Sequence, residues 1–285
     1  MIRFQTMVAV YGACASVGLA CVVQQASPDP APAPAVASMI PYLVADADGV
    51  KCVVIRFKIQ PKWHVYWSNP GDNGSAPTVK LSLPAGWTRG QMEFPRPQVL
   101  GNAEERNYGY EESMDLMIPV VAPVGDAPRT IAVTATVDWL VCKTSCQMGR
   151  ANLSADLTME PNRKLDPVNP RAYPSKLPPG IHTTLEGSPS KGTLVIAGSA
   201  ESFGATPVRF IPDSMGGVEF SYGTGPFLAK QIGKSVTLQI PFEIKLEDAV
   251  DGPPRIRGLI LTGERETDPA YRIDIAAPGV PASAK

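Results

Sequence analysis

The chain has 285 residues, enough for one large or two ordinary domains, and 44% of them are hydrophobic. Its 26 basic and 27 acidic residues give a formal net charge of −1 with no basic block, so there is no electrostatic case for binding nucleic acid or an anionic membrane surface. The 30 prolines and 25 glycines, with little 3.6-residue hydrophobic periodicity, predict a β-rich chain with many turns.

Residues 1–23 have the pattern of an export signal, because Arg3 precedes a short, weakly hydrophobic stretch that begins at Met7. This stretch is too short and too rich in Gly, Ala and Ser for a membrane anchor, and no other segment approaches the length of a membrane-spanning helix. We therefore expect a periplasmic or otherwise exported protein without a membrane span in its mature chain. Cys21 follows small residues and is a candidate lipid anchor.

A Pro/Ala-rich tether is predicted for residues 24–37, and a first β domain for residues 38–159. Short runs of alternating polarity, separated by turn residues, predict an antiparallel β-sandwich there. The predicted strands are 40–46, 51–59, 63–67, 78–83, 90–94, 114–121, 130–142 and 146–159.

A Pro-rich linker is predicted for residues 160–180, a second and smaller β-sandwich for residues 181–278, and a tail for residues 279–285. The expected fold class is therefore all-β, with two antiparallel sandwiches. The strands predicted for the second sandwich are 192–197, 207–211, 217–222, 234–242, 255–262 and 270–276.

One of the two histidines lies in an aromatic segment that continues into Asn-Pro-Gly-Asp. Strand alternation places Trp63, Val65 and Trp67 on one face, which we expect to lie in the core. His64 and Tyr66 then lie on the opposite face. A histidine near a thiol can handle its proton or stabilise its thiolate, whereas an isolated histidine on a strand is more often structural.

Cys142 and Cys146 enclose three residues and follow a run, from Ile131, that alternates like a β-strand. If residues 143–145 form a hairpin loop, the two cysteines become cross-strand neighbours. Their Cβ atoms then lie roughly 4.5–5.5 Å apart, close enough for a disulfide after a small adjustment. The pair would lie at an accessible hairpin end, within reach of a partner's thiol.

Redox exchange, a structural disulfide and metal binding are the three interpretations of this pair. Closing a loop of about five residues constrains the unfolded chain by only roughly 2 kcal/mol, which argues against a purely structural role. Export makes a disulfide chemically sensible. Cys142, Cys146 and Met148 also offer a soft ligand set suited to Cu(I). Cys52, inside a predicted strand, is expected to be a small buried hydrophobic residue.

Residues 101–110 are polar and end in Tyr-Gly-Tyr, which is typical either of a loop that folds over a reactive site or of a solvated connection. The sequence offers no Ser/His/Asp signature that can be placed, no Gly-rich phosphate loop and no paired Cys-x-x-Cys zinc spacing. Hydrolase and nucleotide-dependent activities therefore have no support, and no cofactor is expected.

Three motifs, taken together and in this order, resemble those of one family: residues 63–72, residues 107–111, and residues 137–142 with Cys146. They resemble the N-terminal periplasmic domain of DsbD-type thiol:disulfide interchange proteins, in particular the ScsB-like branch. The resemblance covers about residues 40–160, and residues 160–278 are similar, more loosely, to the second β domain of that branch.

The resemblance implies an immunoglobulin-like sandwich in which Cys142 and Cys146 form the redox pair. Such a pair accepts electrons from a membrane-embedded thiol carrier and passes them to oxidised exported proteins or thioredoxin-like proteins. His64 and Tyr66 match the aromatic positions near the pair.

In the family a loop caps the cysteines, and residues 105–108, beginning at Glu105, match this cap by position. Many relatives have a Phe where this chain has Asn107. The resemblance therefore implies that Tyr108 or Tyr110 shields the pair instead.

Full-length relatives continue into a multi-helix membrane domain and a thioredoxin domain, and neither follows here. We therefore expect a separate electron shuttle of the oxidoreductase type. The alternatives are a Cu(I)-binding or copper-tolerance protein and a non-catalytic interaction module with a structural disulfide. Cys146, which precedes a less regular segment, is predicted to be the attacking thiol, and Cys142, at the end of a well-patterned strand, the resolving one.

Overall fold

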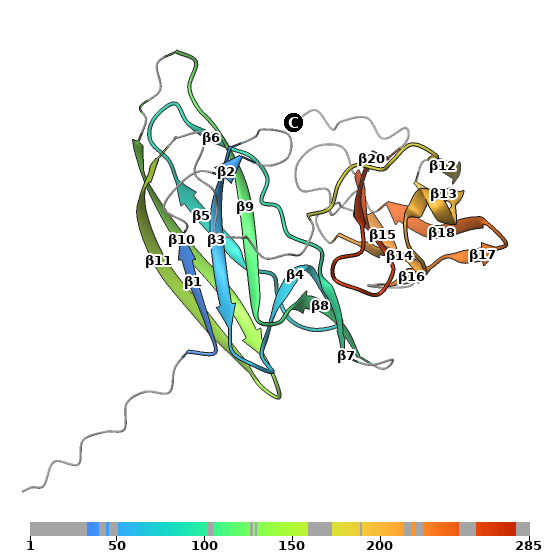
Figure 1. Cartoon of the computed structure of the whole chain (residues 1–285), viewed down its shortest axis with the longest axis horizontal. Coiled ribbons are helices and arrows are strands. Elements are labelled where there is room, and N and C mark those ends of the chain that lie inside the picture. The colour runs from blue at the N-terminus through green and yellow to red at the C-terminus, as the bar shows by residue number, and fades with distance from the viewer. Residues whose placement is uncertain are drawn as a thin grey trace, which may run out of the picture. The chain divides into compact units, whose positions relative to one another are not determined.

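Among the described residues, every regular element is a β-strand except the one-turn helix α1 (Ala200–Phe203) (Figure 1). The all-β fold class is therefore confirmed. No helix among the described residues is long and hydrophobic enough to cross a membrane. The computed structural model describes residues 33–39, 44–45, 51–101, 105–125, 128, 130–158, 173–188, 190–213, 218–220, 225–244 and 255–277, so Cys21, the signal segment and most of the predicted linker lie outside the described residues.

The strands before residue 160 form two antiparallel sheets. The first has the order β1-β3-β9-β6, with β2 paired to β3. Its strands are β1 (Ala35–Met39), β2 (Val44–Ala45), β3 (Lys51–Ile59), β6 (Thr88–Arg89) and β9 (Ser113–Val121). The second has the order β11-β10-β4-β8-β7, with β5 paired to β10. Its strands are β4 (His64–Gly71), β5 (Thr78–Ser82), β7 (Gln98–Gly101), β8 (Arg106–Tyr110), β10 (Thr130–Cys142) and β11 (Cys146–Thr158).

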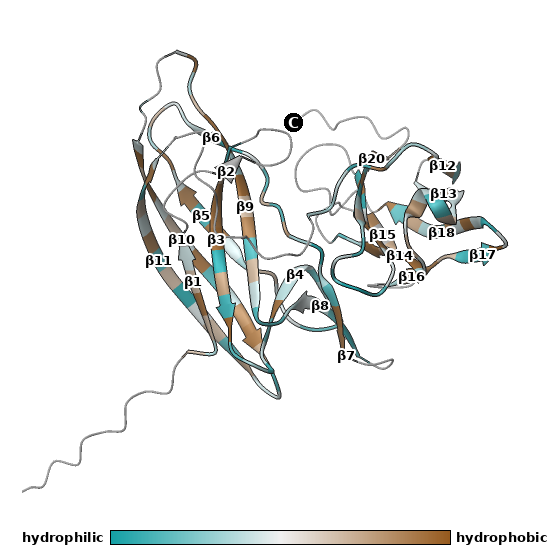
Figure 2. Ribbon diagram, in the orientation of Figure 1, coloured by the Kyte–Doolittle hydropathy of each residue, from teal (hydrophilic) through white to brown (hydrophobic). Residues whose placement is uncertain are grey.

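Strand alternation creates the core between these two sheets. In β10 every second side chain from Ile131 to Val141 is buried, while the intervening ones are exposed or half-buried. Ile55 and Leu116 belong to the same core from the other sheet, and Figure 2 shows hydrophobic residues along β3 and β9, whereas β11 is more hydrophilic. Each fully buried aliphatic side chain stabilises the fold by about 1.5–3 kcal/mol. Trp67 lies in this core, as predicted.

The strands after residue 173 form two further antiparallel sheets around a second core. One has the order β12-β13-β18-β15, with β17 paired to β18, and the other has the order β16-β14-β19-β20. These strands are β12 (Ile181–Gly187), β13 (Lys191–Ser199), β14 (Val208–Pro212), β15 (Val218–Phe220), β16 (Phe227–Leu228), β17 (Lys230–Ile232), β18 (Ser235–Ile244), β19 (Arg255–Thr262) and β20 (Ala270–Ala276).

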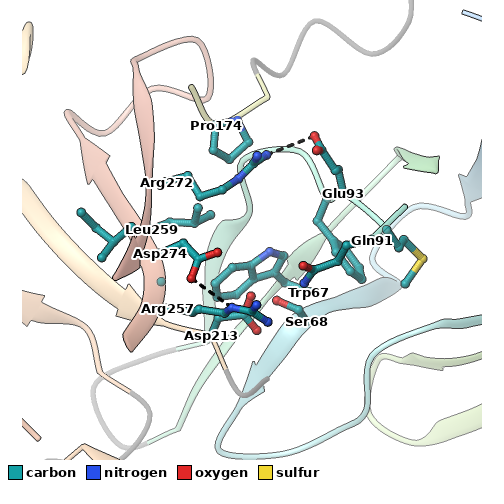
Figure 3. A pocket seen from close by; sticks show the side chains of 14 residues that line it. Trp67, Ser68, Gln91, Glu93, Pro174, Asp213, Arg257, Leu259, Arg272 and Asp274 are labelled. Carbon is teal, nitrogen blue, oxygen red and sulfur yellow. Dashed lines mark hydrogen bonds and ion pairs between the residues drawn. The ribbon is translucent and has the colours of Figure 1, made fainter. Parts of the chain in front are cut away.

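Polar contacts join the two sets of sheets. The amide of Asn69 donates to the carbonyl of Pro212 at 2.7 Å, and the guanidinium of Arg96 donates to that of Pro269 at 2.9 Å. Burial lowers the pKa of Arg96 to about 10. Arg272 pairs with Glu93 at 3.1 Å beside a cavity of about 150 Å³ (Figure 3). The exact domain boundaries nevertheless stay a prediction.

The thiol of Cys52 is buried, as predicted, with 1% of the residue exposed. It packs with Val54 and Met117 against Tyr173, which directly follows the undescribed part of the predicted linker. The Tyr173 hydroxyl donates to the backbone carbonyl of Asp115 at 2.6 Å, and burial raises the pKa of this tyrosine. The end of the predicted linker is therefore packed against the first sandwich.

Several strands lie where the sequence did not predict them. The end of the predicted tether forms β1, which pairs with β3, because Ala35 and Ala37 are small enough to pack into the core although alanine is a weak strand former. Residues 101–110 are not one loop, since β7 and β8 pair with each other on both sides of residues 102–104. β12 was not predicted, and residues 90–94 make only an isolated bridge through Glu93.

In the long hairpin of β10 and β11, one glycine packs closely against a tryptophan ring, and its replacement tests this packing. A Cβ atom at Gly149 would lie 2.1 Å from the ring of Trp139, the residue paired with it across β10 and β11. We predict that Gly149→Ala lowers the free energy of unfolding by about 1–3 kcal/mol, because Trp139 is buried and has to move. Urea denaturation measures this. Ser154→Ala, at an exposed position of the same strand, is the control and should change it by less than about 0.5 kcal/mol.

Candidate functional site

The structure pairs Cys142 with Cys146 at the end of the β10–β11 hairpin, as the sequence predicts. The two residues are direct cross-strand partners, with Cα atoms 4.1 Å apart, and their sulfurs form a disulfide. The turn is closed by a hydrogen bond from the backbone amide of Lys143 to the carbonyl of Ser145 at 3.1 Å. The register along the whole hairpin therefore brings the two thiols together.

The two halves of the disulfide differ in exposure. Cys142 is 3% exposed, whereas Cys146 is an exposed residue at the start of the outer strand β11. A thiolate from another protein therefore has easier access to Cys146 than to Cys142. Attack on Cys146 would leave Cys142 as the departing sulfur, inside the protein.

His64 lies directly across from Cys142 on the other neighbouring strand. Cys142 pairs with His64 of β4 while it pairs with Cys146 of β11, so the three residues form one cross-strand row. Directly opposed residues have Cβ atoms about 4.5–5.5 Å apart. The Nε2 atom of His64 is buried and has no hydrogen-bond partner among the described residues. The structure therefore places a histidine with an unsatisfied Nε2 atom directly across from the buried Cys142.

Tyr66 packs against His64 on the same face of the sheet. Its ring lies 5.0 Å from that of His64, in an edge-to-face arrangement, and it is 2% exposed. Gly74, with a φ of +104°, lies against the ring, and a Cβ atom there would be 2.3 Å from it. Only a glycine allows the chain this close approach in this backbone conformation. The sequence predicted that His64 and Tyr66 share a face, but it did not indicate the covering role of Gly74.

Burial and two nearby carboxylates determine the pKa values of His64 and Tyr66. Burial lowers the pKa of His64, and the charges of Glu111 and Glu105 oppose this by raising it. Burial also raises the pKa of Tyr66, and Glu105 adds to that increase. Desolvation therefore outweighs the attraction of the acids, and His64 is neutral at pH 7.

Glu105 is held by the turn that follows β4. The side-chain amide of Asn73 donates to Glu105 Oε1 at 2.9 Å, and the backbone amide of Arg106 donates to Asp72 Oδ2 at 2.8 Å. The run Asn69-Pro70-Gly71-Asp72 is a turn signal in the sequence, but β4 extends through Gly71, and the role of the residues that follow as an anchor for the start of β8 was not predicted.

The predicted shielding by Tyr108 and Tyr110 is not supported by their positions. Both are fully buried in the core between the sheets, and the Tyr110 hydroxyl donates to the carbonyl of Pro95 at 2.7 Å. Alternation along β8 explains this, because Gly109 lies opposite Tyr66 while Tyr110 lies opposite Val65 on the core face. Of the residues predicted for the cap, Glu105 is the one whose charge acts on His64.

Met148 lies on the same face as the disulfide, two residues beyond Cys146, and is 83% exposed. The described residues contain no group of three His, Cys, Asp or Glu side chains that could hold a metal ion. In the disulfide form neither cysteine provides a thiolate ligand. The Cu(I) alternative built on Cys142, Cys146 and Met148 therefore stays a prediction.

The lowered pKa of His64 makes stability depend on pH. The unfolded chain binds a proton at this residue near the ordinary value of 6.5, and the folded chain does so only at lower pH. This contribution to stability should therefore be complete above about pH 6.5 and be lost as the pH falls from there through the lower pKa of the folded state.

We predict that His64→Gln removes this part of the pH dependence, as measured by urea unfolding at about pH 7.5 and about pH 5.5. His182→Gln is the matched control, since His182 is an exposed residue of β12. Equal pH dependence in the His64 variant and the native protein would contradict the burial of a neutral imidazole.

Comparison with known proteins gives a family match and structures of similar fold. Residues 35–158 match the model of the family described as the N-terminal domain of thiol:disulfide interchange protein DsbD. The N-terminal periplasmic domain of ScsB from Proteus mirabilis has a similar structure, with a TM-score of 0.52 and 14% identity over 85% of this chain and 91% of that chain. At this identity the likeness shows a shared fold.

The N-terminal domain of DsbD from Neisseria meningitidis, in its reduced form, is also similar, with a TM-score of 0.28 and 17% identity over 42% of this chain and 85% of that chain. No curated protein sequence matches the chain. The resemblance seen in the three sequence motifs is confirmed by the family model, and residues 35–158 match the family of DsbD N-terminal domains.

Proposed function

We propose that this protein is an exported thiol-disulfide exchange protein that carries electrons between a membrane-embedded thiol carrier and oxidised exported proteins. One observation supports this above all: the Cys142–Cys146 disulfide lies at a hairpin end and joins an exposed residue, Cys146, to a buried one, Cys142. The match of residues 35–158 to the DsbD N-terminal family supports thiol-disulfide interchange in general.

The reduced protein would react in two steps. The Cys146 thiolate attacks a disulfide of the oxidised partner, forming a mixed disulfide and releasing one partner thiolate, which takes up a proton. The Cys142 thiol then loses its proton, and its sulfur attacks Cys146 Sγ. This closes the Cys142–Cys146 disulfide and releases the second partner thiolate, which is protonated in turn. Two electrons and two protons have then passed to the partner.

The membrane-embedded carrier would restore the dithiol by the reverse exchange, giving up two electrons and two protons and becoming oxidised. His64, Tyr66 and Glu105 form the surroundings of the pair in this proposal. The proposal includes export, which the signal-like pattern of residues 1–23 supports, and lipid attachment at Cys21.

An exchange role requires a disulfide that opens under physiological reductants. We predict a reduction potential for Cys142–Cys146 well above the roughly −300 mV typical of inert structural disulfides. Equilibration of the purified protein with mixtures of reduced and oxidised glutathione, followed by thiol counting, measures it. A bond that stays closed in every mixture would favour the structural disulfide and the interaction-module alternative.

The exposure difference predicts which cysteine contacts the partner. In cells of the native host, Cys142→Ala should accumulate partners as reductant-sensitive adducts on gels, because the exposed Cys146 still attacks and nothing resolves the mixed disulfide. Cys146→Ala is the matched control and should trap few or none. Trapping by neither variant, in cells with a working membrane carrier, would contradict the shuttle and leave Cu(I) binding as the leading account.

A further inference from the structure

We propose that His64 accepts the proton of the Cys142 thiol in the step that resolves the mixed disulfide. This inference rests on the proposed exchange function and assigns a role to a residue that does not itself exchange electrons. The mixed disulfide can be resolved only after Cys142 becomes a thiolate, since the thiolate is the nucleophile. Cys142 is 3% exposed, so bulk water has little access to its proton.

The position of His64 suits this role. It is the direct cross-strand partner of Cys142 on the side away from Cys146, so the imidazole and Cys146 flank the same residue. Its Nε2 atom is buried and has no hydrogen-bond partner among the described residues. An unsatisfied buried nitrogen is costly, and a thiol beside it would provide a donor once the disulfide is reduced.

The neighbours of His64 keep the imidazole in place and neutral. On its own strand the ring is held edge-to-face against Tyr66, 5.0 Å away. Cys142 lies directly across from it on β10, and the charges of Glu111, just after β8, and Glu105, just before β8, act on it. Desolvation outweighs both acids, so that the free imidazole persists at neutral pH and can accept a proton.

The proton balance of the step is complete. The proton moves from Cys142 Sγ to the imidazole of His64, and the new thiolate attacks Cys146 Sγ. The S–S bond forms within the protein as the bond to the partner breaks. The departing partner thiolate takes a proton from the imidazolium or from water, and His64 returns to its neutral form.

The resolving step can be followed alone with a symmetric aromatic disulfide that releases a coloured thiolate. The reduced full-length chain should release one equivalent in a phase that depends on reagent concentration, through attack by Cys146. It should release a second equivalent in a phase independent of that concentration, as Cys142 closes the disulfide. Only this second phase involves His64.

We expect His64→Gln to slow the second phase at neutral pH by about tenfold or more and to leave the first phase unchanged. This effect is small for the loss of a general base, because a thiol ionises in part without one. The rate should recover as the pH rises toward about 8.5, where hydroxide replaces the base. His182→Gln, the exposed-histidine control, should leave both phases unchanged. Equal second phases in His64→Gln and native protein at every pH would overturn the inference.

A second variant keeps the test decisive if His64→Gln does not fold. In the native protein the second phase should slow only below pH 6.5, where His64 becomes protonated. Glu111 raises the pKa of His64, so Glu111→Gln should move the pH at which the second phase slows to a lower value. Glu186→Gln, at an exposed position of β12, is the control and should not move this pH. If Glu111→Gln leaves this pH unchanged or raises it, the inference is overturned.

The two proposals fail in different ways. A native protein that shows a normal second phase insensitive to His64 and Glu111 would remain an exchange protein without this base. A native protein that never closes its disulfide after the first phase would refute the exchange function itself.

Discussion

The register between β10 and β11 is the constraint on which the site depends. Thirteen consecutive pairs run from Thr130 with Thr158 to Cys142 with Cys146. A slip of one residue would turn every side chain of one strand to the opposite face, burying its polar residues and separating the thiols. The same alternation that fills the core therefore also aligns the cysteines.

The second neighbour of β10 changes along its length, and this change creates the site. β5 pairs with β10 from Thr134 to Asp138, whereas β4 pairs with it only at Val141 and Cys142. Val65 then joins Val141 on the core side, and His64 joins Cys142 on the outer side. The two residue pairs between β4 and β10 thus connect the hydrophobic core with the row formed by His64, Cys142 and Cys146.

The chemistry proposed for this row depends on a balance between desolvation and charge. Glu105 and Glu111 attract a proton to His64, but burial of the ring opposes it more strongly. The hydrogen bond from Asn73 to Glu105 limits how this carboxylate can move, and Gly74 lets the same turn cover Tyr66. A turn sequence that reads as a simple connection therefore controls the surroundings of the imidazole.

The sequence by itself determined most of the long strands, their faces and the hairpin around the cysteines, because alternation and turn residues are local signals. It also indicated that His64 and Tyr66 share a face. Only the tertiary structure decided that His64 lies beside Cys142, that Cys142 is buried while Cys146 is exposed, and that Tyr108 and Tyr110 belong to the core. These features arise from pairing between strands far apart in the chain, which local periodicity does not specify.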